Sequence, residues 1–338
     1  MKCGSWAQAR HFAYCAAVAV GAWAVGAWAV GAWAVGVWGV GPWELGPWAV
    51  GEVVRLRREG NLPAAVVVAL LSTVCYATSA VLQELEASRQ ETATRLIRRL
   101  LRRPRWWLAV VASATAAALH IVALALGPLS VVQPLGVLTL VLALPLGARW
   151  GGRAVTGRQW CAAVAVAAGL AAVLGVAPHR ARHAASGLLS VPAATGVIAA
   201  VVVVLVVVSG RLPMPAAPVA RASAAGICFG FASGMTRVAA VGAAPFVAAA
   251  TLAVLGAASG FGLAQLAYRN GGLGAPLATL ILIDPLVAVV IGVTVLGEPV
   301  PVSPLRIALG IAGLIATTGG IWVLAQAAAD REAGPVAG

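Results

Sequence analysis

The chain has 338 residues, of which 61% are hydrophobic and only 10% are charged, and its mean hydropathy is +0.96. A soluble surface needs roughly 25–35% charged residues, so this composition excludes a soluble globular protein and predicts an integral membrane protein. The net charge of +13 can indicate nucleic-acid binding. The arginines, however, lie in short clusters between apolar runs, as in polytopic membrane proteins. We therefore expect membrane lipid, and not nucleic acid, beside the basic residues.

Residues 1–58 are of low complexity. A GAWAV pentapeptide repeats and then drifts, which spaces six tryptophans five residues apart (Trp23, Trp28, Trp33, Trp38, Trp43 and Trp48). This period gives no single tryptophan face on a helix or a strand. Residues 12–43 carry no charge and are long enough to span a membrane. Lys2 and Arg10, followed by the small-x-small sequence at 22–24, alternatively resemble a signal peptide. A tandem duplication or a wrongly assigned start codon is the third interpretation.

Nine apolar runs from Pro63 onward have the length of a membrane-spanning helix, which needs about 20 residues to cross roughly 30 Å of hydrocarbon. Glycines and prolines separate them, as expected for helix breakers. The sequence thus predicts an all-α polytopic membrane protein with about nine transmembrane helices. The predicted spans are 63–82, 106–126, 129–148, 159–177, 187–209, 218–238, 245–267, 273–297 and 305–325.

The longest connection between two predicted spans, residues 83–105, has helical periodicity. Apolar residues at 93, 96, 97, 100 and 101 follow the i, i+3, i+4, i+7 pattern, and arginines at 95, 98, 99, 102 and 103 fill the other face. This pattern predicts a helix on the cytoplasmic surface of the plasma membrane, with anionic lipid headgroups bound at 89–105. A solvated basic loop is the alternative. Either interpretation orients the chain and places residues 327–338 in the cytoplasm as a tail.

The two halves of the chain resemble each other. The sequence at 74–80 aligns with that at 227–233, and QPL at 133–135 aligns with DPL at 284–286. The predicted repeats are 63–177 and 218–325, and 187–209 is the helix that links them. Because five spans separate corresponding helices, the second four-helix repeat is inverted in the membrane. Inverted repeats are typical of secondary transporters that work by alternating access.

Four motifs in these repeats resemble the drug/metabolite transporter superfamily, especially actinobacterial members that are rich in alanine, valine and leucine. The motifs are LLSTVCYATSAVLQ, LALGPLSVVQPL, ATLILIDPLVAVVIGVTVLGE and GIAGLIATTGGIWVL. The resemblance covers 63–326 and is to the EamA-like and NIPA-type (magnesium transporter-like) branches. It implies transport of a small solute or cation. The family's Leu-Gly-Glu sequence is present only in the second half, at 296–298, whereas the first half has Leu-Gly-Ala at 146–148.

Few polar residues fall within the predicted spans. Asp284 lies in the middle of the eighth span, where a carboxyl group costs about 2.5–3.5 kcal/mol, and Pro285 loosens the backbone beside it. We expect Asp284 to be a proton- or cation-coupled site; a protonated carboxyl that bonds to a neighbouring helix is the alternative. Gln133 occupies the equivalent place in the first repeat, and His120 is a candidate proton relay or an interior residue. Candidates for either packing or the substrate cavity are Tyr76, Cys75, Phe229 and Cys228.

Polar residues at predicted helix ends are candidates for gates or for interfacial positions: Glu84, Arg237, Gln265 and Glu298. GxxxG motifs occur at 226–234 and at 256–260, and this spacing of small residues predicts close helix packing.

No HExxH, GxSxG or Walker A motif is present, and the five cysteines have neither CxxC nor Cys/His spacing. We therefore expect no enzyme, no cofactor, no metal centre and no disulfide framework.

The sequence favours a secondary-active transporter, with export of a small metabolite or drug as the first hypothesis. A magnesium or other divalent-cation transporter is the alternative, although such a site gathers several oxygen ligands. A non-transporting membrane scaffold or partner subunit is the alternative of a different class. A homodimer is compatible with each of them.

Overall fold

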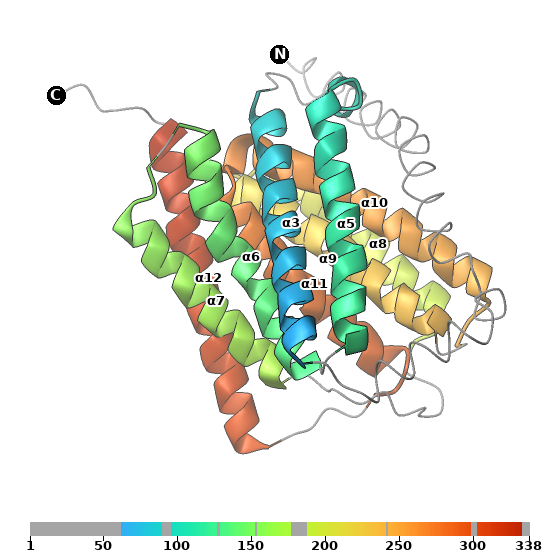
Figure 1. Cartoon of the computed structure of the whole chain (residues 1–338). Helices are drawn as coiled ribbons and strands as arrows, with labels where there is room; N and C mark the ends of the chain where they lie inside the picture. Colours follow the sequence, from blue (N-terminus) through green and yellow to red (C-terminus); the bar gives the residue numbers. More distant parts are fainter. Residues whose placement is uncertain are drawn as a thin grey trace, which may run out of the picture.

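The computed structural model describes residues 62–89, 96–126, 129–152, 154–176, 188–240, 243–298 and 303–332, and these residues are all-helical (Figure 1). The tryptophan repeat and its three interpretations lie outside the described residues. The helices are α3 (Leu62–Ser88), α4 (Leu96–Leu100), α5 (Pro104–Leu126), α6 (Leu129–Trp150), α7 (Gly157–Val176), α8 (Val191–Ser209), α9 (Ala216–Ala240), α10 (Phe246–Gly271), α11 (Gly274–Thr294) and α12 (Pro304–Glu332).

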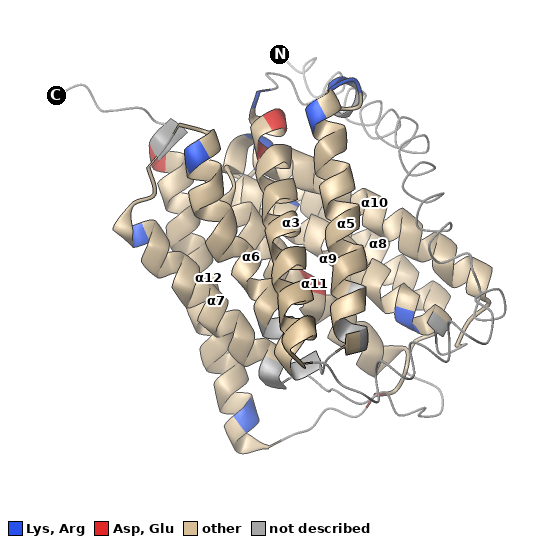
Figure 2. Ribbon diagram, viewed as in Figure 1, with Lys and Arg blue, Asp and Glu red and all other residues tan. Residues whose placement is uncertain are grey.

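Six described helices are long and apolar enough to cross a membrane: α3, α8, α10, α11 and the greater parts of α7 and α12. In α6 the described side chains from Leu135 to Trp150 form a further apolar stretch. Charged residues lie mainly near the helix ends (Figure 2). The prediction of an all-α membrane protein is therefore confirmed for the described residues. Nine crossings stay a prediction, although a long helix overlaps each of the nine predicted spans.

Local sequence signals explain where several helices begin. Thr156 and Gln159 form a capping box at the start of α7. The Gln159 N–H donates to Thr156 Oγ1 at 3.3 Å, and the Thr156 N–H donates to Gln159 Oε1 at 3.0 Å. Ser190 caps α8 by accepting a hydrogen bond from the Ala193 N–H at 3.4 Å. These side chains satisfy backbone donors that have no partner within the helix.

Helices α3, α5, α6 and α7 have the same neighbour relationships as α9, α10, α11 and α12. In the first group α3 packs against α5 and α6, and α6 packs against α7; in the second, α9 packs against α10 and α11, and α11 packs against α12. The two groups meet mainly where α7 packs against α12 and where α3 packs against α10. Helix α8 packs against α9 and leaves most of its valine-rich surface exposed.

The glycines of α9 form a ladder against α11. A Cβ atom at Gly226 would lie 2.8 Å from Ile283 Cβ, and one at Gly234 would lie 2.7 Å from Ile291 Cδ1. At Gly230 a Cβ atom would lie 2.6 Å from Val287 Cβ. Successive glycines of α9 meet successive residues of α11, so the two helices run parallel. Gly256 and Gly260 of α10 likewise face α9, because a Cβ atom at either position would lie 3.0 Å from a backbone oxygen of α9. The predicted close packing at both GxxxG motifs is confirmed.

The described part of 83–105 buries two of its apolar residues against protein, and lipid binding at 89–105 stays a prediction. Helix α3 continues to Ser88, α4 covers Leu96–Leu100 before α5 begins, and Leu96 and Leu100 are fully buried. They pack in one cluster with Trp106 and Phe261. These aromatic side chains offer α4 a protein surface on which to bury its leucines, so the leucines do not face lipid.

Candidate functional site

The central polar contact of the bundle joins α9 to α11. Ser233 Oγ donates a hydrogen bond to Asp284 Oδ1 at 3.3 Å. The glycine ladder brings the two helices together at this level, because a Cβ atom at Gly230 would collide with the Asp284 carbonyl oxygen. Ser233 is exposed and Asp284 is half-buried. The Asp284 side chain is therefore only partly covered by its neighbours, and Ser233 beside it is exposed.

Tyr76 brings the first half of the chain to the same place. It lies on α3, half-buried, and is close enough to Asp284 for the two side chains to interact electrostatically. One turn earlier, Thr73 Oγ1 donates to the Leu135 carbonyl oxygen at 3.1 Å, which fixes α3 against α6. Of the predicted binding residues, Asp284 and Tyr76 are thus brought together.

His120 and Gln133 lie on neighbouring helices. The His120 ring is 3.9 Å from the place that a Cβ atom would take on Gly136, so His120 faces α6. Gln133 is on α6 one turn earlier, and its side chain lies outside the described part of the structure. Within the described part, no hydrogen bond joins His120 to Asp284.

The remaining predicted cavity residues lie elsewhere. A Cβ atom at Gly260 would lie 3.0 Å from the Phe229 ring, and the Cys228 thiol hydrogen-bonds with Ser259. Both side chains therefore contact α10. Cys75 is half-buried on α3, and all three described cysteines are free thiols.

Two of the predicted gating residues form an ion pair at one end of the bundle. Arg237 Nη2 lies 2.7 Å from Glu298 Oε1, and the side chains are 35% and 3% exposed. The positive φ of Gly297, 65°, turns the chain after α11. As a result the Glu298 N–H donates to the Gly292 carbonyl oxygen at 3.0 Å, and its carboxylate lies over Gly292, where a Cβ atom would be 2.6 Å from Oε2. The Leu-Gly-Glu sequence therefore supplies both the turn and the charge.

A chain of hydrogen bonds connects α5, α3 and α10 toward the opposite end. Gln265 Nε2 donates to Gln83 Oε1 at 2.7 Å, and Gln83 Nε2 donates to Ser79 Oγ at 2.9 Å. Ser79 in turn donates to the Ala109 carbonyl oxygen at 2.7 Å. Gln265 is 1% exposed, and its Oε1 atom has no hydrogen-bond partner among the described residues. This junction links the two groups of helices through amide side chains.

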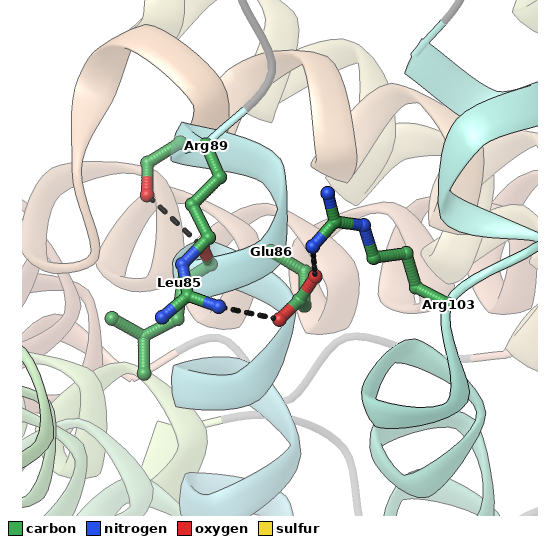
Figure 3. A network of polar contacts seen from close by, with 5 residues as sticks. Leu85, Glu86, Arg89 and Arg103 are labelled. Carbon is green, nitrogen blue, oxygen red and sulfur yellow. Dashed lines mark hydrogen bonds and ion pairs between the residues drawn. The ribbon is translucent and has the colours of Figure 1, made fainter.

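Two buried glutamates lie beside this junction. Glu84 is buried on α3 and interacts electrostatically with the buried Tyr268 of α10. Glu86 lies between two arginines, with Arg89 Nη1 3.1 Å from its Oε1 atom and Arg103 Nη1 3.7 Å from Oε2 (Figure 3). The α3–α10 end thus holds charged groups as well as amides.

Sequence reasoning missed several members of these clusters, namely Ser79, Gln83, Glu86, Ser233 and Tyr268. A seven-residue spacing of polar residues on α3 is the sequence pattern that could have indicated some of them. Ser72 and Ser79 face α5, where they donate to the carbonyl oxygens of Ala116 at 2.8 Å and Ala109 at 2.7 Å, and Glu86 faces Arg103 directly before α5. Tyr76 and Gln83, also seven apart, both face the second group of helices. Two turns of a helix return a side chain to nearly the same face.

The described residues contain no group of three or more His, Cys, Asp or Glu side chains that could hold a metal ion. Comparisons with protein-family models, with curated proteins and with solved structures find no match for this chain. Membership of the drug/metabolite transporter superfamily therefore stays a prediction.

Proposed function

We propose that this chain is a secondary-active transporter that exports a small metabolite or drug across the plasma membrane by alternating access, with Asp284 at its substrate or coupling-ion site. The observation that carries this proposal is the Asp284 carboxyl group in the middle of α11, half-buried and hydrogen-bonded to Ser233. A carboxyl group at this depth is costly and typically serves transport, and here it lies where α9, α11 and Tyr76 of α3 converge.

The packing of the helices supports two inverted repeats. Within its own group, each of α3, α5, α6 and α7 has the main neighbours that its counterpart among α9 to α12 has. Helices α7 and α12 run antiparallel, because Gly169 contacts Gly313 whereas Ala162 and Val166 contact Gly320. Two copies related by an axis in the membrane plane require antiparallel counterparts. The parallel pairs α3–α6 and α9–α11 agree with the same relationship.

Two polar contacts lie along the bundle on opposite sides of Asp284. The Arg237–Glu298 ion pair lies toward the end of α11, and the Gln83–Gln265 hydrogen bond lies toward the opposite end. Alternating access requires one of two barriers to open while the other stays closed. We assign these two contacts to the barriers, since breaking either one exposes buried polar groups that need a new partner.

The chemistry at Asp284 follows from a single carboxylate. It can hold a proton or pair with a cationic group of the solute, but not both at once. The Ser233 hydroxyl group, which donates a hydrogen bond to this carboxyl group, can stabilise its charged form. Competition between the proton and the solute for one carboxylate couples their movements in opposite directions.

The test is proton flux into proteoliposomes that contain the purified full chain, measured against a panel of amines, amino acids and Mg²⁺. Mg²⁺ is included because a magnesium transporter is the alternative hypothesis. We expect a solute-dependent flux that Asp284→Asn abolishes without changing expression or the unfolding transition. Ser233→Ala keeps the carboxylate and is the matched control; its flux should fall by less than tenfold. Undiminished flux in Asp284→Asn would contradict the site.

The Asp284–Ser233 hydrogen bond also favours a second candidate, a non-transporting membrane scaffold in which this bond only joins two helices. In that case Asp284→Asn and Ser233→Ala should lower the stability to the same extent, and no solute should move. The two candidates thus differ in whether the variants change flux or stability.

A further inference from the structure

An arginine-rich surface lies at the α3–α5 end of the bundle, around α4 and the start of α5 (Figure 2). Arg99, Arg102 and Arg105 are exposed there, and we call these three residues the basic ledge. Beneath them Leu96 and Leu100 are fully buried in protein contacts. Because the leucines anchor α4 to the bundle, the ledge is already formed and needs no lipid to fold.

Aromatic packing holds the ledge in place. Trp106 contacts Trp107 edge to face, with ring centroids 5.1 Å apart, and Phe261 of α10 in the same way at 5.8 Å. Trp107 Nε1 donates to the Leu101 carbonyl oxygen at 2.9 Å, which closes the turn between α4 and α5. Tryptophans at the end of a membrane helix are typical of the headgroup level. The ledge therefore lies at the boundary between hydrocarbon and water.

The charge of the ledge is uncompensated within the described part of the chain. The nearby Glu86 carboxylate is shared by Arg89 and Arg103, whose side chains are each 49% exposed. Arg99, Arg102 and Arg105 make no ion pair with the described residues. Three exposed guanidinium groups over one stretch of seven residues form an anion-binding surface, because each can bind phosphate oxygens in a bidentate manner.

We propose that the basic ledge binds the phosphate headgroups of anionic phospholipids in the cytoplasmic leaflet. A free phosphate ion has the same oxyanion chemistry, but the ledge lies beside the ends of apolar helices, where lipid headgroups are concentrated. This mode of binding differs from insertion of an amphipathic helix, since the leucines of α4 are occupied by protein. Binding should therefore depend on headgroup charge and ionic strength, and not on packing defects between acyl chains. This lipid-binding proposal does not depend on the proposed transport activity.

The test uses the full chain in lipid nanodiscs with spin-labelled phosphatidylglycerol or spin-labelled phosphatidylcholine. The measured quantity is the relative association constant of each lipid with the protein. We expect phosphatidylglycerol to be preferred at low salt and the preference to decline at high salt. A basic residue near an anionic surface strengthens binding about fivefold. The preference for phosphatidylglycerol should therefore fall at least about tenfold in the triple variant Arg99→Gln, Arg102→Gln, Arg105→Gln.

Two further variants separate local binding from general charge and from misfolding. Arg306→Gln removes an exposed arginine at the other end of the bundle and should leave the preference unchanged. The triple Arg→Lys variant keeps the charge and should retain most of the preference. Inorganic phosphate at millimolar concentration should not displace the lipid. The proposal is overturned by equal association of both lipids, by an unchanged preference in the triple Gln variant, by an equal loss in Arg306→Gln, or by displacement with phosphate.

Discussion

Glu298 is buried beneath Arg237 at 2.7 Å, and the space for its carboxylate exists because residue 292 is glycine. The ion pair therefore depends on two glycines, Gly297 for the turn and Gly292 for the space. It ties the chain that follows α11 back to the end of α9.

Glu298→Gln should lower the free energy of unfolding by about 1–2 kcal/mol. A fully buried broken pair would cost more, but Arg237 is 35% exposed and can recover part of its hydration. Chemical denaturation in detergent measures the change. Arg306→Gln, which removes an exposed arginine, is the control and should be neutral. A double-mutant cycle with Arg237→Gln should give a coupling energy above about 0.5 kcal/mol; additive effects would contradict the pairing.

Gly230→Ala should destabilise the protein by about 1–3 kcal/mol, the range for overpacked sites. The added methyl group would lie 2.6 Å from Val287 Cβ and against the α11 backbone, and backbone cannot move aside as a flexible side chain can. Gly196→Ala is the matched control, because nothing lies within 4 Å of its Cβ position. The control should be neutral or stabilising by up to about 1 kcal/mol. Thermal unfolding compares the two variants, and equal shifts would disprove the ladder.

Gln83→Leu should cost about 1–3 kcal/mol, because it leaves the buried Gln265 amide without its 2.7 Å acceptor. Adding Gln265→Leu should recover most of the loss, since replacing both partners leaves no unsatisfied amide at this contact. Unfolding of the two single variants and the double variant measures this. If the double variant were less stable than either single variant, the hydrogen bond would not be the main interaction between these residues.

Cysteine labelling in whole cells should show opposite exposure for the two ends of the bundle. In a background without native cysteines, Arg306→Cys should react with a membrane-impermeant maleimide. Arg102→Cys should react only after permeabilisation, because the basic ledge is expected on the cytoplasmic side. Both arginines are exposed, so access to the reagent and not burial decides the result. Labelling of Arg102→Cys in intact cells would reverse the orientation.

The positions of the long helices could be predicted from the sequence, because apolar runs of fixed length are a local property. Helix α3 extends to Ser88, beyond the predicted end at residue 82, since its last turns carry buried polar residues that a hydropathy pattern excludes. Gln83 and Glu84 find their partners on α10, and Glu86 finds Arg103 directly before α5. Hydropathy measures the side chain alone and does not include such partners.

The candidate site was predictable only in part for the same reason. Asp284 stands out because it is an acidic residue inside an apolar run. Its partner Ser233 is 51 residues away in the chain, and Gln265 pairs with Gln83 across 182 residues. These contacts follow from how the helices pack. Similarly, the periodicity of α4 is a correct description of its leucines, but it does not say whether lipid or protein covers them.

The glycine ladder has a consequence for how the chain is made. Gly226, Gly230 and Gly234 have their partner surface on α11, which emerges from the ribosome roughly 60 residues after α9. At about 5–20 residues per second, α9 waits some 3–12 seconds in the membrane with this narrow face uncovered, while α10 is still being inserted. The nascent protein must therefore keep lipid or other helices from occupying the groove until its proper neighbour arrives. Synonymous codon changes that slow translation between α9 and α11 should then lower the yield of folded protein without changing its final stability.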